Sequence, residues 1–168
     1  MEGSRFALPG IFLSLLIATP VAHAQVMASR VEVHKAERKL LVYAGDRLLA
    51  TYPVVLGGSP IGHKRQEGDR RTPEGDYLLD RKNPRRAYHL SIHVSYPNAT
   101  DRRQARARGV SPGGDIMIHG QPNDAAFRKA LEAWPGHDWT DGCIALSNAD
   151  MKRLWDQVAV PIPIRIEP

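Results

Sequence analysis

The stretch Thr140–Leu146, which reads TDGCIAL, holds the single cysteine of this 168-residue chain. His119 lies 24 residues before that cysteine, at the end of the strand-like apolar run Ile116–Ile118. A lone cysteine cannot form an intramolecular disulfide, and the glycine before it lets the backbone turn tightly and approach a ligand closely. If the imidazole meets the Cys143 thiol in space, the two side chains form a nucleophile with its own base.

Two interpretations of Cys143 stay open from these residues. The thiol is either a small buried hydrophobe beside Ile144 and Leu146 or a nucleophile that uses the histidine. An unpaired thiol in an oxidising compartment is a liability unless it is buried or used. The sequence also predicts export to such a compartment, which favours the interpretation of Cys143 as a nucleophile.

The N-terminal residues 1–24 are expected to be an export signal. Arg5 supplies the positive region, Ile11–Ala18 forms a short apolar core, and Ala22–Ala24 gives a small-x-small cleavage pattern. A membrane-spanning helix needs roughly 20 apolar residues, and this run is shorter. An uncleaved anchor is the alternative, which the short core disfavours. Cleavage after Ala24 leaves residues 25–168, which we expect to form one domain in the periplasm or cell envelope, with no membrane span.

The net charge of +5 at pH 7 is unevenly distributed. Between His63 and Arg108 there are twelve Lys and Arg against six Asp and Glu. A basic surface suits a polyanion. Because no helix-turn-helix pattern or RNA-binding aromatic signature accompanies the charge, we expect no nucleic-acid partner. An acidic wall polymer or an anionic membrane surface is the expected neighbour, and a solvated basic flap is the alternative.

Alternating apolar and polar residues predict a mostly antiparallel β domain. The predicted strands span residues 30–34, 39–43, 48–56, 76–80, 88–96, 115–119 and 162–166. Turn-forming residues 44–47 join the second and third strands as a hairpin. Pro161 and Pro163 place the last strand at a sheet edge or at a strand start.

Two short helices are expected near the C-terminal end. Apolar residues recur with helical spacing over Phe127–Trp134 and over Met151–Val158, each after a helix-start signal. The tryptophans are interpreted as core anchors. The polar, Arg-rich segment Pro97–Gly114 is expected to be a mobile loop over the site.

A Cys-His pair needs further groups around it. The base must be oriented by a carboxylate or a backbone carbonyl, and Asp115, Asp138 and Asp141 are carboxylate candidates. Backbone amides around Gly142–Ile144 are placed to form an oxyanion hole. Activity is expected to rise with pH as the pair reaches its reactive protonation state.

A metal centre is the weaker alternative for these side chains. His89, His93 and His137 add possible ligands, but no compact zinc pattern appears. His89 and His93 lie on a predicted strand, where a spacing of four residues holds them well apart. We therefore expect no metal and no other cofactor.

These features together resemble the YkuD-type (ErfK-YbiS-like) L,D-transpeptidase catalytic domain. The resemblance rests on His119-Gly120, the 24-residue gap, the T-x-G-C-I-A-L stretch, the meander through Tyr52–Gly58 and the turn Thr72–Gly75. It runs from about Val31 to Ile166 and implies a mostly β fold, an antiparallel sheet or sandwich with two short helices. It also implies attack on the bond between the third and fourth residues of peptidoglycan stem peptides.

The family's catalytic roles carry over to four residues. The resemblance implies that Cys143 is the nucleophile, that His119 is the general base and that the Gly120 carbonyl steadies the imidazole. The amides of Gly142 and Cys143 would hold the oxyanion.

The resemblance implies a cell-wall transferase with a role in wall biogenesis and cell shape. The acyl-enzyme would pass to an amine, giving a cross-link or an attached protein. With water as acceptor, the same site would be an L,D-carboxypeptidase or endopeptidase that could release a murein-linked protein. The expected partners are stem peptides and a murein-anchored protein, and the chain is expected to be a monomer. A non-catalytic wall-binding module that uses the basic segment is the hypothesis from a different class.

The sequence departs from the common family pattern S/T-H-G-C-x-R at two positions. Asp141 stands where the pattern has histidine, and Ala145 stands where it has arginine, as in a branch that includes murein-anchored-protein hydrolases. An ionised Asp141 would raise the thiol pKa if it pointed towards the sulfur, and would otherwise turn outwards or orient a donor. Without the arginine, a carboxylate clamp must come from elsewhere. The candidate arginines are Arg102, Arg103, Arg106 and Arg108, and the other candidate substrate-binding residues are Thr140, Asp141 and Ile144.

Overall fold

The computed structural model describes residues 26–84 and 87–168, so the predicted export signal lies outside the described residues. The strands are β1 (Arg30–His34), β2 (Lys39–Ala44), β3 (Arg47–Pro53), β4 (Gly75–Asn83), β5 (Ser91–Val94), β6 (Met117–His119), β7 (Ile144–Ala145) and β8 (Ile162–Glu167). The helices within these residues are α1 (Ala99–Ala107), α2 (Ala125–Glu132) and α3 (Asn148–Gln157).

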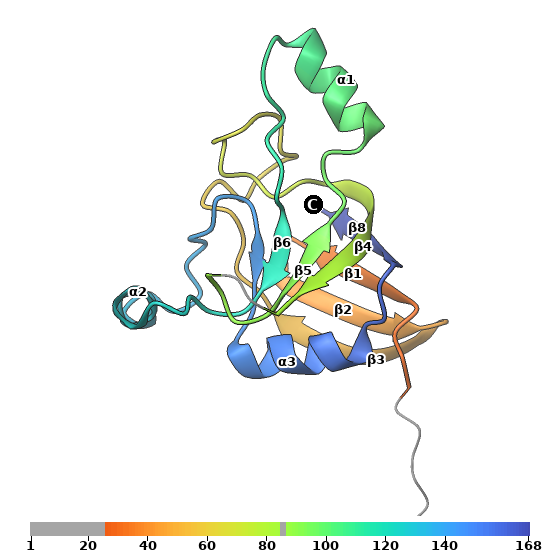
Figure 1. Ribbon diagram of the computed structural model, residues 1–168, viewed down its shortest axis with the longest axis vertical. Helices are drawn as coiled ribbons and strands as arrows, with labels where there is room; N and C mark the ends of the chain where they lie inside the picture. The colour runs from red at the N-terminus through yellow and green to blue at the C-terminus, as the bar shows by residue number, and fades with distance from the viewer. Residues whose placement is uncertain (1–25, 85–86) are drawn as a thin grey trace, which may run out of the picture.

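The strands form one sheet in the order β3-β2-β1-β8-β4-β5-β6-β7. Neighbours pair antiparallel except β1 with β8 and β6 with β7, which are parallel. The segment after β3 also reaches β7: Val55 and Ala145 exchange two backbone hydrogen bonds of 2.9 Å. This contact joins the two ends of the sheet and gives it the curled shape seen in Figure 1. The predicted fold class, mostly β with short helices, is confirmed.

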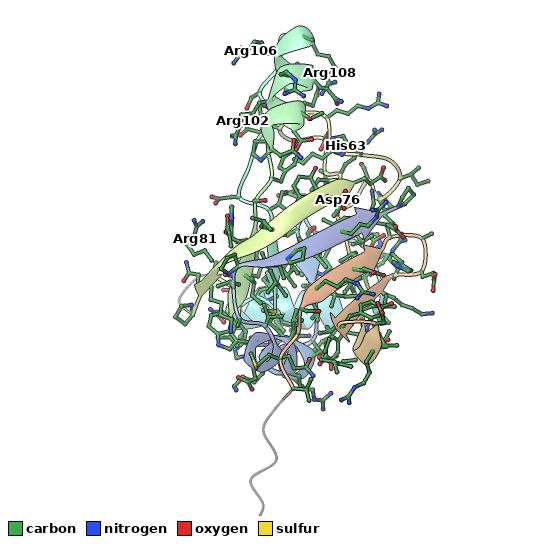
Figure 2. All side chains as sticks on the ribbon, turned by 90° about the vertical axis from the view of Figure 1, so that its right-hand side faces the viewer. His63, Asp76, Arg81, Arg102, Arg106 and Arg108 are labelled. Atoms are coloured by element: carbon green, nitrogen blue, oxygen red, sulfur yellow. The ribbon has the colours of Figure 1, made fainter. Side chains whose placement is uncertain are left out.

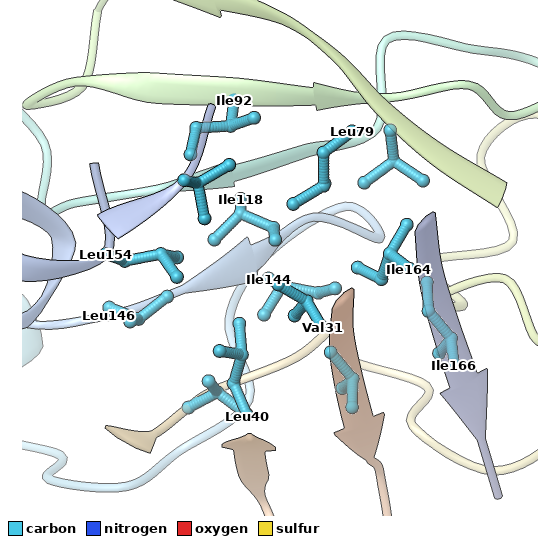
Figure 3. Packing of buried hydrophobic residues seen from close by; sticks show 14 of the residues in the cluster. Val31, Leu40, Leu79, Ile92, Ile118, Ile144, Leu146, Leu154, Ile164 and Ile166 are labelled. Carbon is cyan, nitrogen blue, oxygen red and sulfur yellow. The ribbon is translucent and has the colours of Figure 1, made fainter. Parts of the chain in front are cut away.

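One hydrophobic cluster fills the inside of the curled sheet. Period-two alternation on the strands turns every second side chain inwards, and α3 covers the cluster with Met151 and Leu154. Figure 3 shows Val31 and Leu40 from one end of the sheet beside Ile118 and Leu154. Because β6 and β7 are tied to this core, the residues at their ends have fixed positions.

The position of β8 decides between the two placements that its prolines predict: β8 lies between β1 and β4 rather than at an edge, and Pro161 and Pro163 fall at its start, just before the strand and at its second residue. Pro163 is opposite Leu78 of β4. The Leu78 N–H donates to Ser95 Oγ, and the Leu78 carbonyl accepts from the Ser95 N–H, each at 2.9 Å. On the other side, the register with β1 begins at Ile164. Neither neighbour requires an amide at Pro163, so the proline fits an interior strand.

The segment Pro97–Gly114 corrects an expectation, because it contains helix α1 rather than only a loop. Asn98 Oδ1 accepts the backbone N–H of Thr100 and of Asp101, and Asp101 Oδ2 accepts the Asn98 N–H at 2.8 Å. This is a capping box, and it precedes arginine, alanine and glutamine, which are good helix formers. Only Asp101 and Ala105 are buried, so the helix has no apolar stripe for a periodicity argument to detect.

The tryptophans were expected to be core anchors, and only Trp155 packs against the core cluster. Trp134 follows α2 and is 69% exposed. No residue of α2 is buried, and Figure 1 shows this helix beside the sheet rather than under it. The apolar spacing over Phe127–Trp134 therefore identified a helix but not a core-facing helix.

Within residues 26–84 and 87–168, we find no helix long and apolar enough to cross a membrane.

Candidate functional site

The parallel pair β6–β7 brings the two signature segments side by side. Ile118 is opposite Ile144 and His119 is opposite Ala145. Cys143 directly precedes β7, so it falls opposite Met117, two positions from the histidine. Side chains two apart on a strand share a face, and diagonal neighbours lie within reach of long side chains. The register therefore directs the thiol and the imidazole to the same side of the sheet.

The turn before β7 is fixed by Thr140, whose side chain is buried. The Thr140 hydroxyl donates to the Cys143 carbonyl at 2.7 Å and accepts the Gly142 N–H at 3.1 Å. Because the Gly142 amide is bonded within the turn, Cys143 N–H is the better candidate for an oxyanion donor. Gly142 instead supplies a backbone conformation with φ of +122°, which L side chains rarely adopt.

Gly142→Ala is expected to destabilise the fold by about 2–4 kcal/mol and to reduce activity, because the new Cβ meets backbone as well as adopting a strained φ. That Cβ would lie 2.6 Å from the Arg71 carbonyl oxygen. Gly68→Ala is the matched control, since Gly68 has φ of +75° with nothing within 4 Å. Its cost should stay near 1 kcal/mol. Urea unfolding of both variants measures the difference, and equal midpoints would refute the close packing of the turn.

The Cys143 thiol is protonated in this conformation. Its sulfur lies 3.7 Å from the Asp115 carbonyl oxygen, which accepts a long hydrogen bond. Burial raises the pKa of the thiol; a hydrogen bond from the Met117 backbone lowers it in part, and the negative charges of Asp115 and Asp141 raise it again. Among the described residues, no hydrogen bond joins the sulfur to His119. The resting site thus holds a neutral thiol, which limits its oxidation.

His119 is held as a neutral imidazole. The imidazole is 2% exposed, and its Nδ1 lies 2.7 Å from the Gly120 carbonyl oxygen. A carbonyl only accepts, so Nδ1 carries the proton and Nε2 is left with a lone pair. This is the contact that the family resemblance implies for Gly120. Burial lowers the pKa of His119 to about 4, against a smaller opposing effect of the Gly120 carbonyl.

The buried imidazole should make the fold sensitive to acid. In the unfolded chain His119 binds a proton below its ordinary pKa of 6.5, whereas the folded chain excludes it down to about 4. The contribution of His119 is therefore complete above pH 6.5 and is lost as pH falls towards 4, by about 3 kcal/mol. Urea unfolding across this range should show the fall, and His119→Gln should flatten it. An equal slope in both proteins would contradict the burial of a neutral imidazole.

Two aromatic side chains that the sequence interpretation missed line the site. The Tyr88 ring stacks on His119, with centroids 4.1 Å apart and planes at 27°. Trp139 lies 5.8 Å from the same imidazole. Burial is the largest effect that raises the pKa of Tyr88. Tyr88 therefore packs directly on His119, and no local motif around it indicates this contact.

The carboxylates proposed to orient the base are placed differently. Asp138 Oδ2 lies 2.6 Å from Arg38 Nη2, and its Oδ1 accepts the Leu56 N–H at 2.8 Å. Asp138 therefore fixes the segment that follows β3 and does not orient the imidazole. Asp141 turns outwards: its side chain is 91% exposed, and Arg70 Nε lies 3.5 Å from its Oδ1. Orientation of His119 falls to the Gly120 carbonyl.

The candidate substrate-binding residues fall into two groups, one in the segment around Cys143 and one on helix α1. Ile144 is fully buried in the core, so any contact with substrate would use its backbone, and Thr140 acts within the turn. Asp141 is exposed two residues before Cys143. Arg102 and Arg106 line a separate cavity of about 530 Å³ between α1 and the loop that follows it.

No cluster of three or more His, Cys, Asp or Glu side chains among residues 26–84 and 87–168 is arranged to hold a metal ion. His93 instead pairs with Asp80, with Nδ1 and Oδ1 2.7 Å apart.

Comparison with known families agrees with this geometry. The profile of the YkuD family, described as the L,D-transpeptidase catalytic domain, matches residues 28–166. A relative from Escherichia coli K12, "Putative L,D-transpeptidase YafK", is 34% identical over 122 residues, which cover 66% of this chain and 48% of that protein.

Solved structures share the same architecture. The helical cell shape determining protein Pgp2 from Campylobacter jejuni is 27% identical with a TM-score of 0.62, and the match covers 83% of this chain and 47% of that one. An L,D-transpeptidase from Mycobacterium smegmatis is 15% identical with a TM-score of 0.55, covering 84% of this chain and 59% of that one, and supports the fold alone. The chain spans about half the length of YafK and Pgp2.

Proposed function

The chain belongs to the family of L,D-transpeptidase catalytic domains, and from this premise we propose that it is an exported cysteine acyltransferase acting on peptidoglycan stem peptides. The observation that carries the proposal is the pairing of β6 with β7, which turns Cys143 and a neutral His119 to one face. A binding module would need neither a fixed imidazole nor a thiol beside it.

Acylation begins with the proton of the thiol. His119 Nε2 takes the proton from Cys143 Sγ as the sulfur attacks the carbonyl carbon of the third stem residue. The Cys143 N–H stabilises the oxyanion that forms. Collapse of this intermediate breaks the carbon–nitrogen bond, and His119 returns the proton to the amine of the leaving fourth residue. A thioester of Cys143 with the shortened stem remains.

Deacylation determines the product. An acceptor amine gives its proton to His119 and attacks the thioester, which forms a new amide and restores the thiol. Water in the same position gives a free carboxylate, which makes the protein a carboxypeptidase or endopeptidase. Transfer is our proposal, and hydrolysis, including release of a murein-linked protein, is the alternative outcome.

The residues around Cys143 support this cycle by fixing where its reacting groups lie. Thr140 fixes the turn that presents the sulfur, and Gly142 gives the turn its conformation. Asp141, exposed beside the thiol and next to Arg70, is placed to meet a charged group of the substrate. A role in cell shape is supported by the likeness to Pgp2, a helical cell shape determining protein.

Product analysis tests the proposal. The protein is incubated with tetrapeptide muropeptides, and products are identified by mass spectrometry, with a Cys143→Ala form as the control. Cross-linked dimers are expected, and only with the native cysteine. Tripeptides without dimers would show that the protein is a hydrolase rather than a transferase. Unchanged substrate together with retained binding would refute the proposal that the protein is an enzyme.

A further inference from the structure

Helix α1 projects from the sheet but is firmly anchored at its base. Figure 1 shows it standing away from the strands. Its first-turn Asp101 is buried and accepts the Tyr77 hydroxyl at 3.1 Å. His63 Nε2 lies 3.2 Å from the other carboxylate oxygen. Side chains further along α1 are thus presented on a fixed element rather than on a mobile loop.

Two of these side chains face a cavity. Arg102 and Arg106 line a space of about 530 Å³ whose opposite wall is the loop after α1, including Gly109, Pro112 and Gly113. Figure 2 shows both arginines on the same side of α1. Residues four apart on a helix have their Cβ atoms about 5–6 Å apart, so the two guanidiniums can act on one ligand.

The cavity carries positive charge without a counterion. No acidic residue lines it, and among the described residues neither guanidinium has an ion-pair or hydrogen-bond partner. Their neighbours differ: Arg103 Nη2 donates to Thr100 Oγ1 at 2.9 Å, and Arg108 Nη2 donates to the Arg65 carbonyl at 2.8 Å. Two like charges at this spacing repel each other, and a bound anion would remove the repulsion.

The cavity is also close to the nucleophile along the chain. Gly113 lines it, and the carbonyl of Asp115, two residues later, contacts the Cys143 sulfur. Two extended residues span at most about 7 Å. The loop wall of the cavity therefore belongs to the same segment of chain that contacts the thiol.

We propose that the Arg102–Arg106 cavity binds a free carboxylate of the stem peptide whose backbone is attacked at Cys143. This inference rests on the proposed function. A planar guanidinium matches a carboxylate through two parallel hydrogen bonds, and the pair supplies such a clamp from α1. The substrate preferred by the site is accordingly a stem peptide with unmodified side-chain carboxylates.

Binding to the inactive Cys143→Ala protein tests the cavity without requiring turnover. A tetrapeptide with free carboxylates and the same peptide with its side-chain carboxylates amidated are titrated by calorimetry. Arg102→Gln with Arg106→Gln should weaken binding of the free peptide about tenfold, as expected for loss of charge-assisted hydrogen bonds. The amidated peptide should bind weakly to both proteins. Arg103→Gln, on the same helix, is the matched control and should bind as the parent does.

The remaining outcomes separate the rival accounts. An unchanged dissociation constant for the free peptide in the double variant overturns the inference. If that variant instead loses binding to vesicles containing anionic phospholipid while binding the peptide normally, the cavity is a headgroup site and the inference is wrong. If the parent binds neither peptide, the proposed function fails, and the inference fails with it. In the active enzyme, the double variant should raise KM about tenfold with kcat unchanged.

Discussion

A Cys143→Ala variant is expected to lose turnover of tetrapeptide muropeptides by about 10⁵-fold or more, to the level of the uncatalysed reaction. The reason is that the sulfur is the only protein atom that bonds to the substrate carbonyl in the proposed cycle. Burial raises the pKa of the thiol, and in the proposed cycle His119 removes the proton during attack. Rates of dimer and tripeptide formation, followed by liquid chromatography, measure the loss.

The variant should keep its fold, which separates lost chemistry from lost structure. The turn around Cys143 is held by the Thr140 hydroxyl through the backbone carbonyl of residue 143, and alanine retains that carbonyl. Circular dichroism and the unfolding midpoint should therefore match the parent. Turnover within tenfold of the parent would exclude Cys143 as the nucleophile.

His119→Gln carries the second large effect, a fall in kcat of about 10²–10⁴-fold, which is the usual contribution of a general base. Glutamine keeps a polar group in the buried site but cannot take the proton. His137→Gln serves as the control, because His137 is an exposed imidazole beside Trp134. It should leave kcat unchanged.

The pH profile gives the same test in the unmodified protein. Since burial lowers the pKa of His119 to about 4, the base is neutral through the physiological range. Activity should fall as pH drops through about 4 and stay level above it, until the thiol itself ionises above its ordinary range. This corrects the expectation of a rise with pH between pH 5 and 9: because burial lowers the pKa of His119 to about 4, the rise moves to about pH 4 and activity is level above it. A midpoint near pH 6.5 would show that the imidazole is solvated and not buried as described.

The strands were predictable because their patterns are local. Arg30–His34 alternates in the sequence and forms β1 with the same bounds. The β8 position was not predictable from Pro163 alone, because its compatibility with an interior strand depends on Ser95 taking the Leu78 hydrogen bonds. Helix α1 was missed for the opposite reason. It forms through the Asn98–Asp101 capping box and intrinsic propensity, with no apolar stripe.

The candidate site likewise divides into features that local sequence patterns indicate and features that depend on contacts remote in sequence. Cys143 and His119 could be proposed from the sequence because their residue types and glycine neighbours are distinctive, and the β6–β7 register is consistent with that proposal. The sequence did not identify Tyr88, whose stacking on the imidazole accompanies a backbone bridge to Pro122, a residue remote in sequence. It also assigned the Gly142 amide to the oxyanion, whereas the Thr140 hydroxyl engages that amide. Contacts between residues remote in sequence decide such details.

The central claim is that Cys143 forms a thioester with the stem peptide, and mass spectrometry of the acid-quenched protein and its peptides tests it most directly. The protein is mixed with tetrapeptide, quenched in acid within the first turnover and digested. The account predicts a mass gain equal to the tripeptidyl fragment, located on the peptide that contains Cys143 and absent from the Cys143→Ala protein. Product formation with no adduct on Cys143, or with the adduct on another residue, would contradict it.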